Sequence, residues 1–96
     1  MKVVGRDKLV AFCVAFPDAR RWIESWLAEF GAAGWRTPHD LKAMYASASL
    51  LGRSVVIFNV KGNRYRMEAT VAYGTGVVVI QWIGTHAEYD ARNARR

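Results

Sequence analysis

The sequence has little cysteine and no long apolar stretch, and each shortage excludes a class of protein. Cys13 is the only cysteine among the 96 residues, which excludes an internal disulfide and a multi-cysteine zinc site. Apolar runs such as residues 77–80 are far shorter than the roughly 20 residues that span a bilayer. A charged segment, residues 5–8, stands where a signal peptide would be apolar. We therefore expect a soluble, cytoplasmic protein that does not associate with membranes.

Apolar residues are plentiful by contrast. They make up 52% of the chain and aromatic residues 12%, which is too much for a chain that cannot collapse into a core. The length fits one small domain, residues 1–96, without a separate cofactor-binding domain. We expect no cofactor.

The charge is positive and uneven. The chain has 14 basic and eight acidic residues, and residues 53–96 carry seven basic residues against three acidic ones. Those seven are Arg53, Lys61, Arg64, Arg66, Arg92, Arg95 and Arg96. Such a surface serves to bind a polyanion or an acidic protein, or only to keep a small protein soluble. Composition leaves both open.

Two stretches near the N-terminus have apolar side chains at helical spacing. The first follows Asp7, a candidate N-cap, and is interrupted by Pro17, and the second ends at Gly31. Their apolar positions are Leu9, Phe12, Cys13 and Phe16, and then Ala19, Trp22, Ile23, Trp26, Leu27 and Phe30. We expect two amphipathic helices with these stripes in the core.

The rest of the chain is predicted to be mainly β-structure. Residues 1–4 suit a short strand, Thr37 caps a short turn of helix, and residues 47–52 break the pattern. Strands are expected at 54–60, 64–73 and 77–83, with turns at 61–63 and 74–76. Thr85 and Glu88 are spaced as a capping box for a last helix through Arg92. The predicted class is α+β, in the order β-α-α-β-β-β-α, with two N-terminal helices on one face of an antiparallel sheet.

Arg64 and Arg66 are two residues apart in a predicted strand, so we expect them to project side by side from one face. Guanidinium groups bind phosphate bidentately and stay charged, so the pair could grip adjacent phosphate oxygens. The alternative is an ordinary solvated face, with Glu68 neutralising Arg66.

The second candidate cluster lies in the last helix. His86, Tyr89 and Asp90 fall on one helical face, and an imidazole, a phenol and a carboxylate can perform acid–base chemistry without a metal. Asp90 could hold the tautomer of His86. The alternative is a capped helix whose polar face is exposed to solvent and has no catalytic role.

Other chemistries lack their motifs. The sequence contains no G-x-S-x-G, no phosphate-binding G-x-x-x-x-G-K-[ST], and no G-x-G-x-x-G. His39 and His86 are the only histidines, and neither has a second ligand at a recognised metal spacing, so we expect no metal site. Lys61 and Asn63 in the predicted turn could approach a phosphate.

Residues 35–90 resemble the HigB family of bacterial toxins, part of the RelE-like superfamily. The matching segments are P.DLKA at 38–43, VIFNV at 56–60, GNRYR at 62–66 and GTHAEYD at 84–90. The resemblance implies N-terminal helices packed on a twisted antiparallel sheet, with a basic concave face and polar catalytic groups near the C-terminus. It also implies a toxin that cleaves mRNA, generally on translating ribosomes, and is neutralised by a helix-turn-helix antitoxin, HigA.

On that resemblance we expect the ribose 2′-hydroxyl to attack the adjacent phosphorus. His86 would be general base or acid, Tyr89 its partner in proton transfer or a stacking surface, and Asp90 would orient His86. Arg66 and Arg64 would stabilise the transition state. The remaining RNA-binding residues would be Lys61, Asn63, Gln81 and Arg92. Many relatives have arginine where this chain has Gln81, a neutral amide that cannot offset developing charge.

Two non-catalytic alternatives stay open. The chain could be a nucleic-acid-binding module that uses its basic sheet face, which aromatic side chains on that face would favour. It could also be an interaction subunit for an acidic protein.

Overall fold

The computed structural model describes residues 1–52 and 54–94. Arg53, Arg95 and Arg96, three of the basic residues of the C-terminal half, lie outside the described residues. The elements are β1 (Lys2–Val4), α1 (Arg6–Ala15), a 3₁₀ helix η1 (Pro17–Ala19), α2 (Arg20–Ala32), α3 (Pro38–Met44), β2 (Ser49–Leu51), β3 (Val55–Val60), β4 (Tyr65–Ala72), β5 (Val77–Thr85) and α4 (His86–Ala94).

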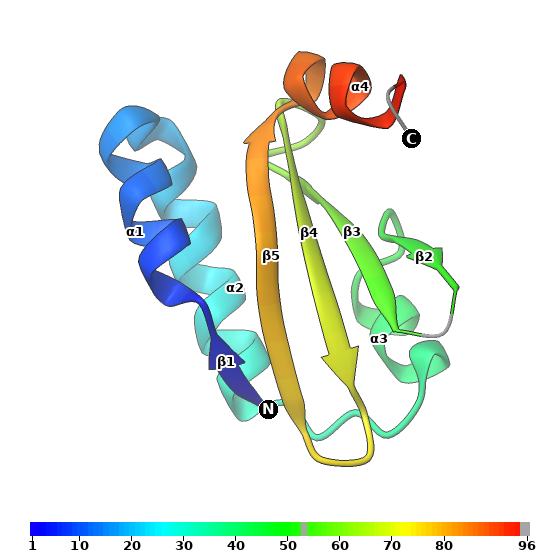
Figure 1. The fold of residues 1–96 in the computed structure, drawn as a ribbon. Helices are drawn as coiled ribbons and strands as arrows, with labels where there is room; N and C mark the ends of the chain where they lie inside the picture. The colour runs from blue at the N-terminus through cyan, green and yellow to red at the C-terminus, as the bar shows by residue number, and fades with distance from the viewer. Residues whose placement is uncertain (53, 95–96) are drawn as a thin grey trace.

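The strands form one sheet in the order β1-β5-β4-β3-β2 (Figure 1). The pairs from β2 to β5 are antiparallel, and those of β3 with β4 and of β4 with β5 confirm the prediction. β1, however, lies parallel to β5, with Val3 opposite Val78, so the expectation of a purely antiparallel sheet is wrong at this edge. A three-residue strand carries too short a pattern to indicate its partner.

Helices α1 and α2 cover one face of the sheet (Figure 1), and their predicted apolar stripes point into the core. Trp26 stacks on Phe30, with ring centroids 4.2 Å apart, and meets Phe58 of β3 edge-on at 5.4 Å. Complete burial of such a side chain contributes about 1.5–3 kcal/mol. The strands bury Val56, Phe58, Val60, Met67, Ala69, Val71, Val78 and Ile80 in this core. Because side chains alternate along a strand, Arg66, Glu68 and Thr70 lie on the opposite face, here called the distal face.

The helix ends differ from the predicted ones at two places. α1 begins after Gly5, whose φ is 93°, and has no side-chain cap, so Asp7 lies in the first turn and is not the N-cap. A Cβ on Gly5 would lie 3.0 Å from the carbonyl oxygen of Ile80, so only glycine fits this close approach to β5. α2 continues through Gly31, which therefore does not end it. The interruption at Pro17 is confirmed.

Two elements between α2 and β3 lengthen the predicted order. The Oγ1 of Thr37 accepts the Asp40 N–H at 3.2 Å, which confirms the predicted cap of α3. β2 then forms at the sheet edge, with Leu50 opposite Val56, where the sequence predicted only a break. The observed order therefore has one more helix and one more strand than expected.

Two irregularities in the hairpins decide which way polar side chains point. Lys61 and Gly62 have φ of 51° and 69°, and β4 starts only at Tyr65, so Arg64 lies in the turn. Farther along, Glu68 pairs with Trp82 and Ala69 with Ile80, which leaves Gln81 as an extra residue in β5. This bulge places Trp82 beside Glu68 on the distal face.

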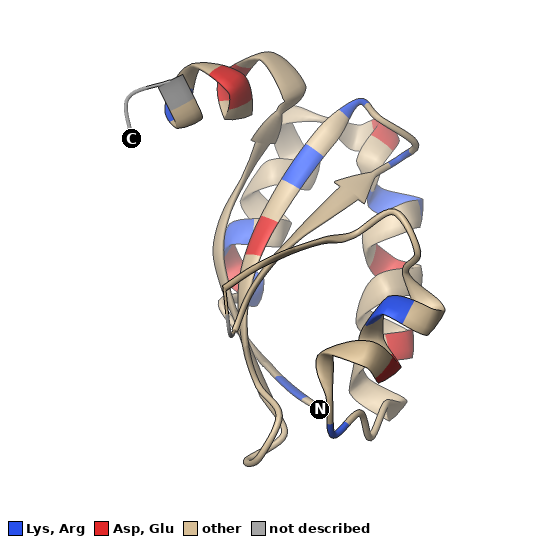
Figure 2. Cartoon of the chain, turned by 90° about the vertical axis from the view of Figure 1, so that its right-hand side faces the viewer, with Lys and Arg blue, Asp and Glu red and all other residues tan. Residues whose placement is uncertain are grey.

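Charged residues are spread over both layers. In Figure 2 basic and acidic positions are interspersed along the helices, and basic positions also mark the tip of the β3–β4 hairpin. No helix in the described part of the chain is long and apolar enough to cross a membrane.

Candidate active site on the distal face

Helix α4 starts with the predicted capping box. The Thr85 N–H donates to Oε1 of Glu88 at 2.9 Å, and the Glu88 N–H donates to Oγ1 of Thr85 at 3.1 Å. The reciprocal bonds satisfy amides that a helix start would leave without a partner. They fix α4 directly at the end of β5, with His86 as its first residue.

His86 and Asp90 are in contact within the first turns of α4. Nδ1 of His86 lies 2.9 Å from Oδ2 of Asp90, and the two side chains are 37% and 61% exposed. A bond from Nδ1–H to the carboxylate leaves Nε2 as the nitrogen that can take or give a proton. The pair therefore has the geometry of an oriented acid–base group.

Arg66 of β4 reaches toward the same helix. Its guanidinium donates to Oδ1 of Asn63 at 2.7 Å, and its Cζ lies 5.8 Å from the centre of the Tyr89 ring. Asn63 is uncharged, so this bond orients the guanidinium without neutralising it. Arg66 thus contacts both Asn63 and Tyr89, and Tyr89 follows His86 by three residues on α4.

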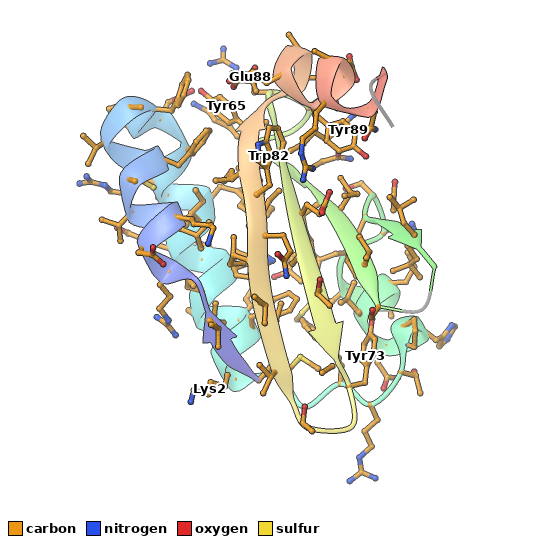
Figure 3. All side chains as sticks on the ribbon, viewed as in Figure 1. Lys2, Tyr65, Tyr73, Trp82, Glu88 and Tyr89 are labelled. Carbon is orange, nitrogen blue, oxygen red and sulfur yellow. The ribbon has the colours of Figure 1, made fainter. Side chains whose placement is uncertain are left out.

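An aromatic and basic cluster extends this site along the sheet. In Figure 3 Trp82 and Tyr89 lie close together beneath α4, with ring centroids 6.1 Å apart. Arg92 covers Trp82, with its Cζ 5.0 Å from the centre of the Trp82 ring. The guanidinium of Arg92 also donates to Oε1 of Glu68 at 2.7 Å. Glu68 is 9% exposed, so this ion pair is partly buried and ties α4 to β4.

Sequence reasoning missed Trp82 because strict alternation from Val78 and Ile80 puts it on the core face. The bulge at Gln81 reverses its direction. The available signal was Gly84, since glycine inside a strand often marks a bulge or a close approach. A Cβ on Gly84 would lie 2.5 Å from the Trp82 ring, so the glycine makes room for the indole.

A second polar cluster, here called the Asp18 cluster, comprises Asp18, Lys61, Arg64 and Tyr65. Asp18, in η1 between α1 and α2, accepts bonds from the Tyr65 hydroxyl at 2.7 Å, from Arg64 at 3.1 Å and from Lys61 at 3.2 Å. The Tyr65 bond, followed by those from Lys61 and Arg64, lowers the pKa of the Asp18 carboxyl. The same bond raises the pKa of the Tyr65 phenol.

The structure therefore divides the predicted site residues into two groups. His86, Asp90, Tyr89, Arg66, Asn63 and Arg92 come together around α4 and the distal face. Lys61 and Arg64 belong to the Asp18 cluster.

The expectation that Arg64 and Arg66 project side by side is wrong, because Arg64 precedes β4 and its guanidinium binds Asp18. Glu68, the acidic neighbour of Arg66 in the solvated-face alternative, forms an ion pair with Arg92.

Gln81 lies farther along the sheet. Its Nε2 donates to Oγ1 of Thr70 at 3.3 Å, and its side chain is exposed. As the extra residue of the bulge it is not paired with β4. The described residues include no group of three or more His, Cys, Asp or Glu side chains that could hold a metal ion.

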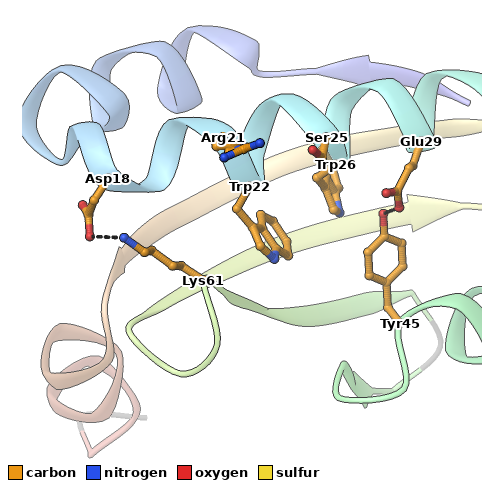
Figure 4. A pocket seen from close by; sticks show the side chains of 8 residues that line it. All are labelled: Asp18, Arg21, Trp22, Ser25, Trp26, Glu29, Tyr45 and Lys61. Atoms are coloured by element: carbon orange, nitrogen blue, oxygen red, sulfur yellow. Dashed lines mark hydrogen bonds and ion pairs between the residues drawn. The ribbon is translucent and has the colours of Figure 1, made fainter.

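A pocket of about 550 Å³ opens on the side of α2 (Figure 4). Its lining residues are Asp18, Arg21, Trp22, Ser25, Trp26, Glu29, Tyr45 and Lys61. The Tyr45 hydroxyl donates to Glu29 at 2.5 Å, and burial together with this bond raises the pKa of Tyr45. The buried indole N–H of Trp26 has no hydrogen-bond partner among the described residues. Two of its lining residues, Asp18 and Lys61, belong to the Asp18 cluster.

Comparison with known proteins finds a match to a protein family. The model of the HigB toxin family, described as the RelE-like toxic component of a toxin-antitoxin system, matches residues 19–92. This range includes α2, all of β2 to β5 and His86, Tyr89, Asp90 and Arg92 of α4. No curated protein matches the sequence.

Proposed function

The chain belongs to the HigB toxin family, the RelE-like toxic components of toxin-antitoxin systems, and on this premise we propose that it is an endoribonuclease that cleaves mRNA. A toxin of such a system has an antitoxin partner. We propose that the antitoxin is a helix-turn-helix protein of the HigA type. We further propose that residues 1–96 act as one cytoplasmic domain on translating ribosomes, where mRNA cleavage stops translation and growth.

The observation that carries the proposal is the His86–Asp90 contact of 2.9 Å on α4, the helix whose Tyr89 ring lies against Arg66. Cleavage of RNA without a metal needs a base, an acid and a cation at one phosphate. Imidazole, phenol and guanidinium are groups that meet these needs. A binding surface alone has no need for an imidazole oriented by a carboxylate.

In the proposed reaction the ribose 2′-oxygen attacks the adjacent phosphorus. The bond from 2′-oxygen to phosphorus forms and the bond to the 5′-oxygen breaks, giving a 2′,3′-cyclic phosphate and a 5′-hydroxyl. One of His86 and Tyr89 takes the 2′-hydroxyl proton, and the other gives a proton to the 5′-oxygen. Arg66 stabilises the extra negative charge on the phosphorus oxygens during this exchange.

The other predicted residues bind RNA in this proposal. Asn63 and Arg92 flank the reacting phosphate on the distal face, and Gln81 contacts a phosphate or a base edge farther along. Lys61 and Arg64 both bind the carboxylate of Asp18, which offsets part of the charge that they offer to RNA. Arg64 therefore contributes less to the transition state than Arg66.

One observation favours a second candidate, a non-catalytic module that binds single-stranded RNA. Trp82 and Tyr89 present aromatic rings next to Arg66 and Arg92 on the distal face. Stacking of bases on such rings is worth about 1–3 kcal/mol per base. The same rings serve a nuclease, so the two candidates differ only in whether His86 is needed.

The test is cleavage of a defined mRNA in EDTA, with and without translating ribosomes, by wild type and His86→Ala. The side chain of His86 is about one-third exposed and takes no part in the capping box, so the variant should keep its circular dichroism spectrum. We expect cleavage by wild type on ribosomes and none by His86→Ala. Equal cleavage by both removes His86 from the mechanism, and RNA binding without cleavage favours the binding module.

A further inference from the structure

The carboxylate of Asp18 anchors the turn between β3 and β4 to the helical layer. Asp18 accepts bonds from Lys61 and Arg64 of the turn and from Tyr65, the first residue of β4. Figure 4 shows the Asp18–Lys61 pair spanning the gap between the α1–α2 junction and the hairpin tip. Because three residues donate to the carboxylate of Asp18, they hold this turn more firmly than the backbone of the turn alone would.

The same turn also holds the two groups to which we assign the chemistry. The carbonyl oxygen of Arg64 accepts the backbone N–H of His86 at 3.1 Å. Oδ1 of Asn63 accepts a hydrogen bond from the guanidinium of Arg66 at 2.7 Å. Tyr65 lies opposite Thr85, the residue before His86, in the β4–β5 pairing. A shift of the turn would therefore move His86 and Arg66 together.

We propose that Asp18 is a positioning residue for RNA cleavage, which fixes His86 and Arg66 by anchoring the turn that binds both. The inference rests on the proposed function for its catalytic consequence. Asp18 touches neither His86 nor Arg66 and acts through Arg64, Tyr65 and the turn. It also keeps two cations, Lys61 and Arg64, bound to a carboxylate of the protein itself.

This double role predicts opposite effects on catalysis and on binding. Removal of the carboxylate releases the turn, so the reacting groups lose their placement and kcat falls. The same removal frees Lys61 and Arg64 for phosphate, so RNA binding is equal or tighter. Loss of the fold would instead weaken both, which makes the split between kcat and KM the distinguishing observation.

The experiment compares Asp18→Asn and Asp18→Ala with Glu24→Gln, a matched charge change on the exposed side of α2. All are assayed well below their unfolding temperatures. We expect kcat to fall at least about tenfold in the Asp18 variants, since small misplacements near the chemistry cost up to 10²-fold. KM should be unchanged or lower. An unchanged kcat, or a KM that rises as kcat falls, overturns the proposal.

Binding is measured separately with an RNA that carries 2′-deoxyriboses and cannot be cleaved by the proposed reaction. Each freed cation that contacts a phosphate should steepen the dependence of log affinity on log salt by about 0.7. Asp18→Ala should therefore bind with the steeper slope and Glu24→Gln with that of wild type. Weaker binding by Asp18→Ala at low salt contradicts the release of Lys61 and Arg64.

Amide hydrogen exchange tests the anchoring without any reference to activity. The His86 amide, bound to the Arg64 carbonyl, should exchange at least about tenfold faster in Asp18→Ala. The Val71 amide, which binds the Ser54 carbonyl at 2.8 Å at the other end of the sheet, is the internal control. Equal changes at both amides overturn the anchoring. If wild type does not cleave RNA, the proposed function fails while exchange at His86 still decides whether Asp18 holds the turn.

Discussion

Asp18 and Asp90 each accept from side chains of one polar cluster, and they differ in what they leave available. Asp18 is surrounded by two cations and a phenol that all donate to it. Asp90 contacts one imidazole nitrogen and is 61% exposed, so the other nitrogen of His86 is not committed to it. The first arrangement pairs two cations with one carboxylate and suits anchoring, whereas the second orients a group and leaves it able to react.

The two arginines of the RYR segment repeat this difference. Arg64 binds the carboxylate of Asp18, while Arg66 binds the neutral amide of Asn63 and faces the Tyr89 ring. Both residues are arginines and they are only two positions apart. Only Arg66, however, has a neutral partner that leaves its charge without an offset. Partner chemistry, more than position in the sequence, thus separates an anchoring arginine from one that can meet a phosphate.

The sharpest test of this difference replaces each arginine in turn. Arg66→Ala should lower kcat by about 10²-fold, the typical cost of a lost electrostatic group at a transition state. Arg64→Ala should lower it by a smaller factor, because its guanidinium is held by Asp18. Single-turnover cleavage measures both, with the exposed Arg36→Ala as control. A larger loss for Arg64→Ala would reverse the assignment.

Removal of the negative charge of Asp90 should have the next largest effect. Asp90→Asn leaves an oxygen that can accept from Nδ1 but no charge to stabilise the imidazolium. We expect kcat to fall at least about tenfold, because the carboxylate holds the tautomer of the imidazole and stabilises the imidazolium that forms. Cleavage kinetics and RNA affinity are measured together, and affinity should not change. Wild-type kcat in the variant would show that the contact is only a surface ion pair.

Loss of the contact between α4 and the sheet should mainly affect stability. Arg92→Ala removes a partner of the partly buried Glu68 and the cover of Trp82. Because the pair is partly exposed, we expect the free energy of unfolding to fall by about 1 kcal/mol. Urea denaturation checks this value, with the exposed Arg20→Ala as comparison. A change within the error of the Arg20→Ala control would mean that the ion pair does not hold α4.

The smallest effect concerns acid stability. The pKa of Asp18 is lowered in the folded protein, first by the Tyr65 bond and then by Lys61 and Arg64. The stability it contributes is complete above its ordinary pKa of 3.8 and is lost as pH falls through the lower folded value. The difference in unfolding midpoint between wild type and Asp18→Asn should therefore shrink below pH 3.8. A difference that does not depend on pH would exclude the ionised carboxylate as its source.

Local sequence patterns predicted most of the fold. The stripes ending at Phe16 and Phe30, the break at Pro17 and the caps at Thr37 and Thr85 are all present, because each depends on neighbouring residues. β1 and β2 were harder to predict, since strands of three residues gain their stability from partners distant in the sequence. The parallel pairing of β1 with β5 is such a case.

The arrangement of the candidate site was predictable where its residues lie on one element. His86, Tyr89 and Asp90 share a helix, and the spacing alone places His86 against Asp90. Arg64 was misplaced because its direction depends on Asp18, which is 46 residues away. Trp82 was missed because a bulge reverses its face, and alternation carries no information about an inserted residue.

The most direct test of the proposed chemistry is the identity of the RNA ends left by the wild-type protein. Attack by the ribose 2′-hydroxyl predicts a 2′,3′-cyclic phosphate on one fragment and a 5′-hydroxyl on the other, and an RNA with a single 2′-deoxyribose before the cleaved bond should stay intact. Mass spectrometry of the fragments identifies both ends. Fragments with a 3′-hydroxyl and a 5′-phosphate, or cleavage of the deoxy-substituted RNA, would contradict the roles proposed for His86 and Arg66.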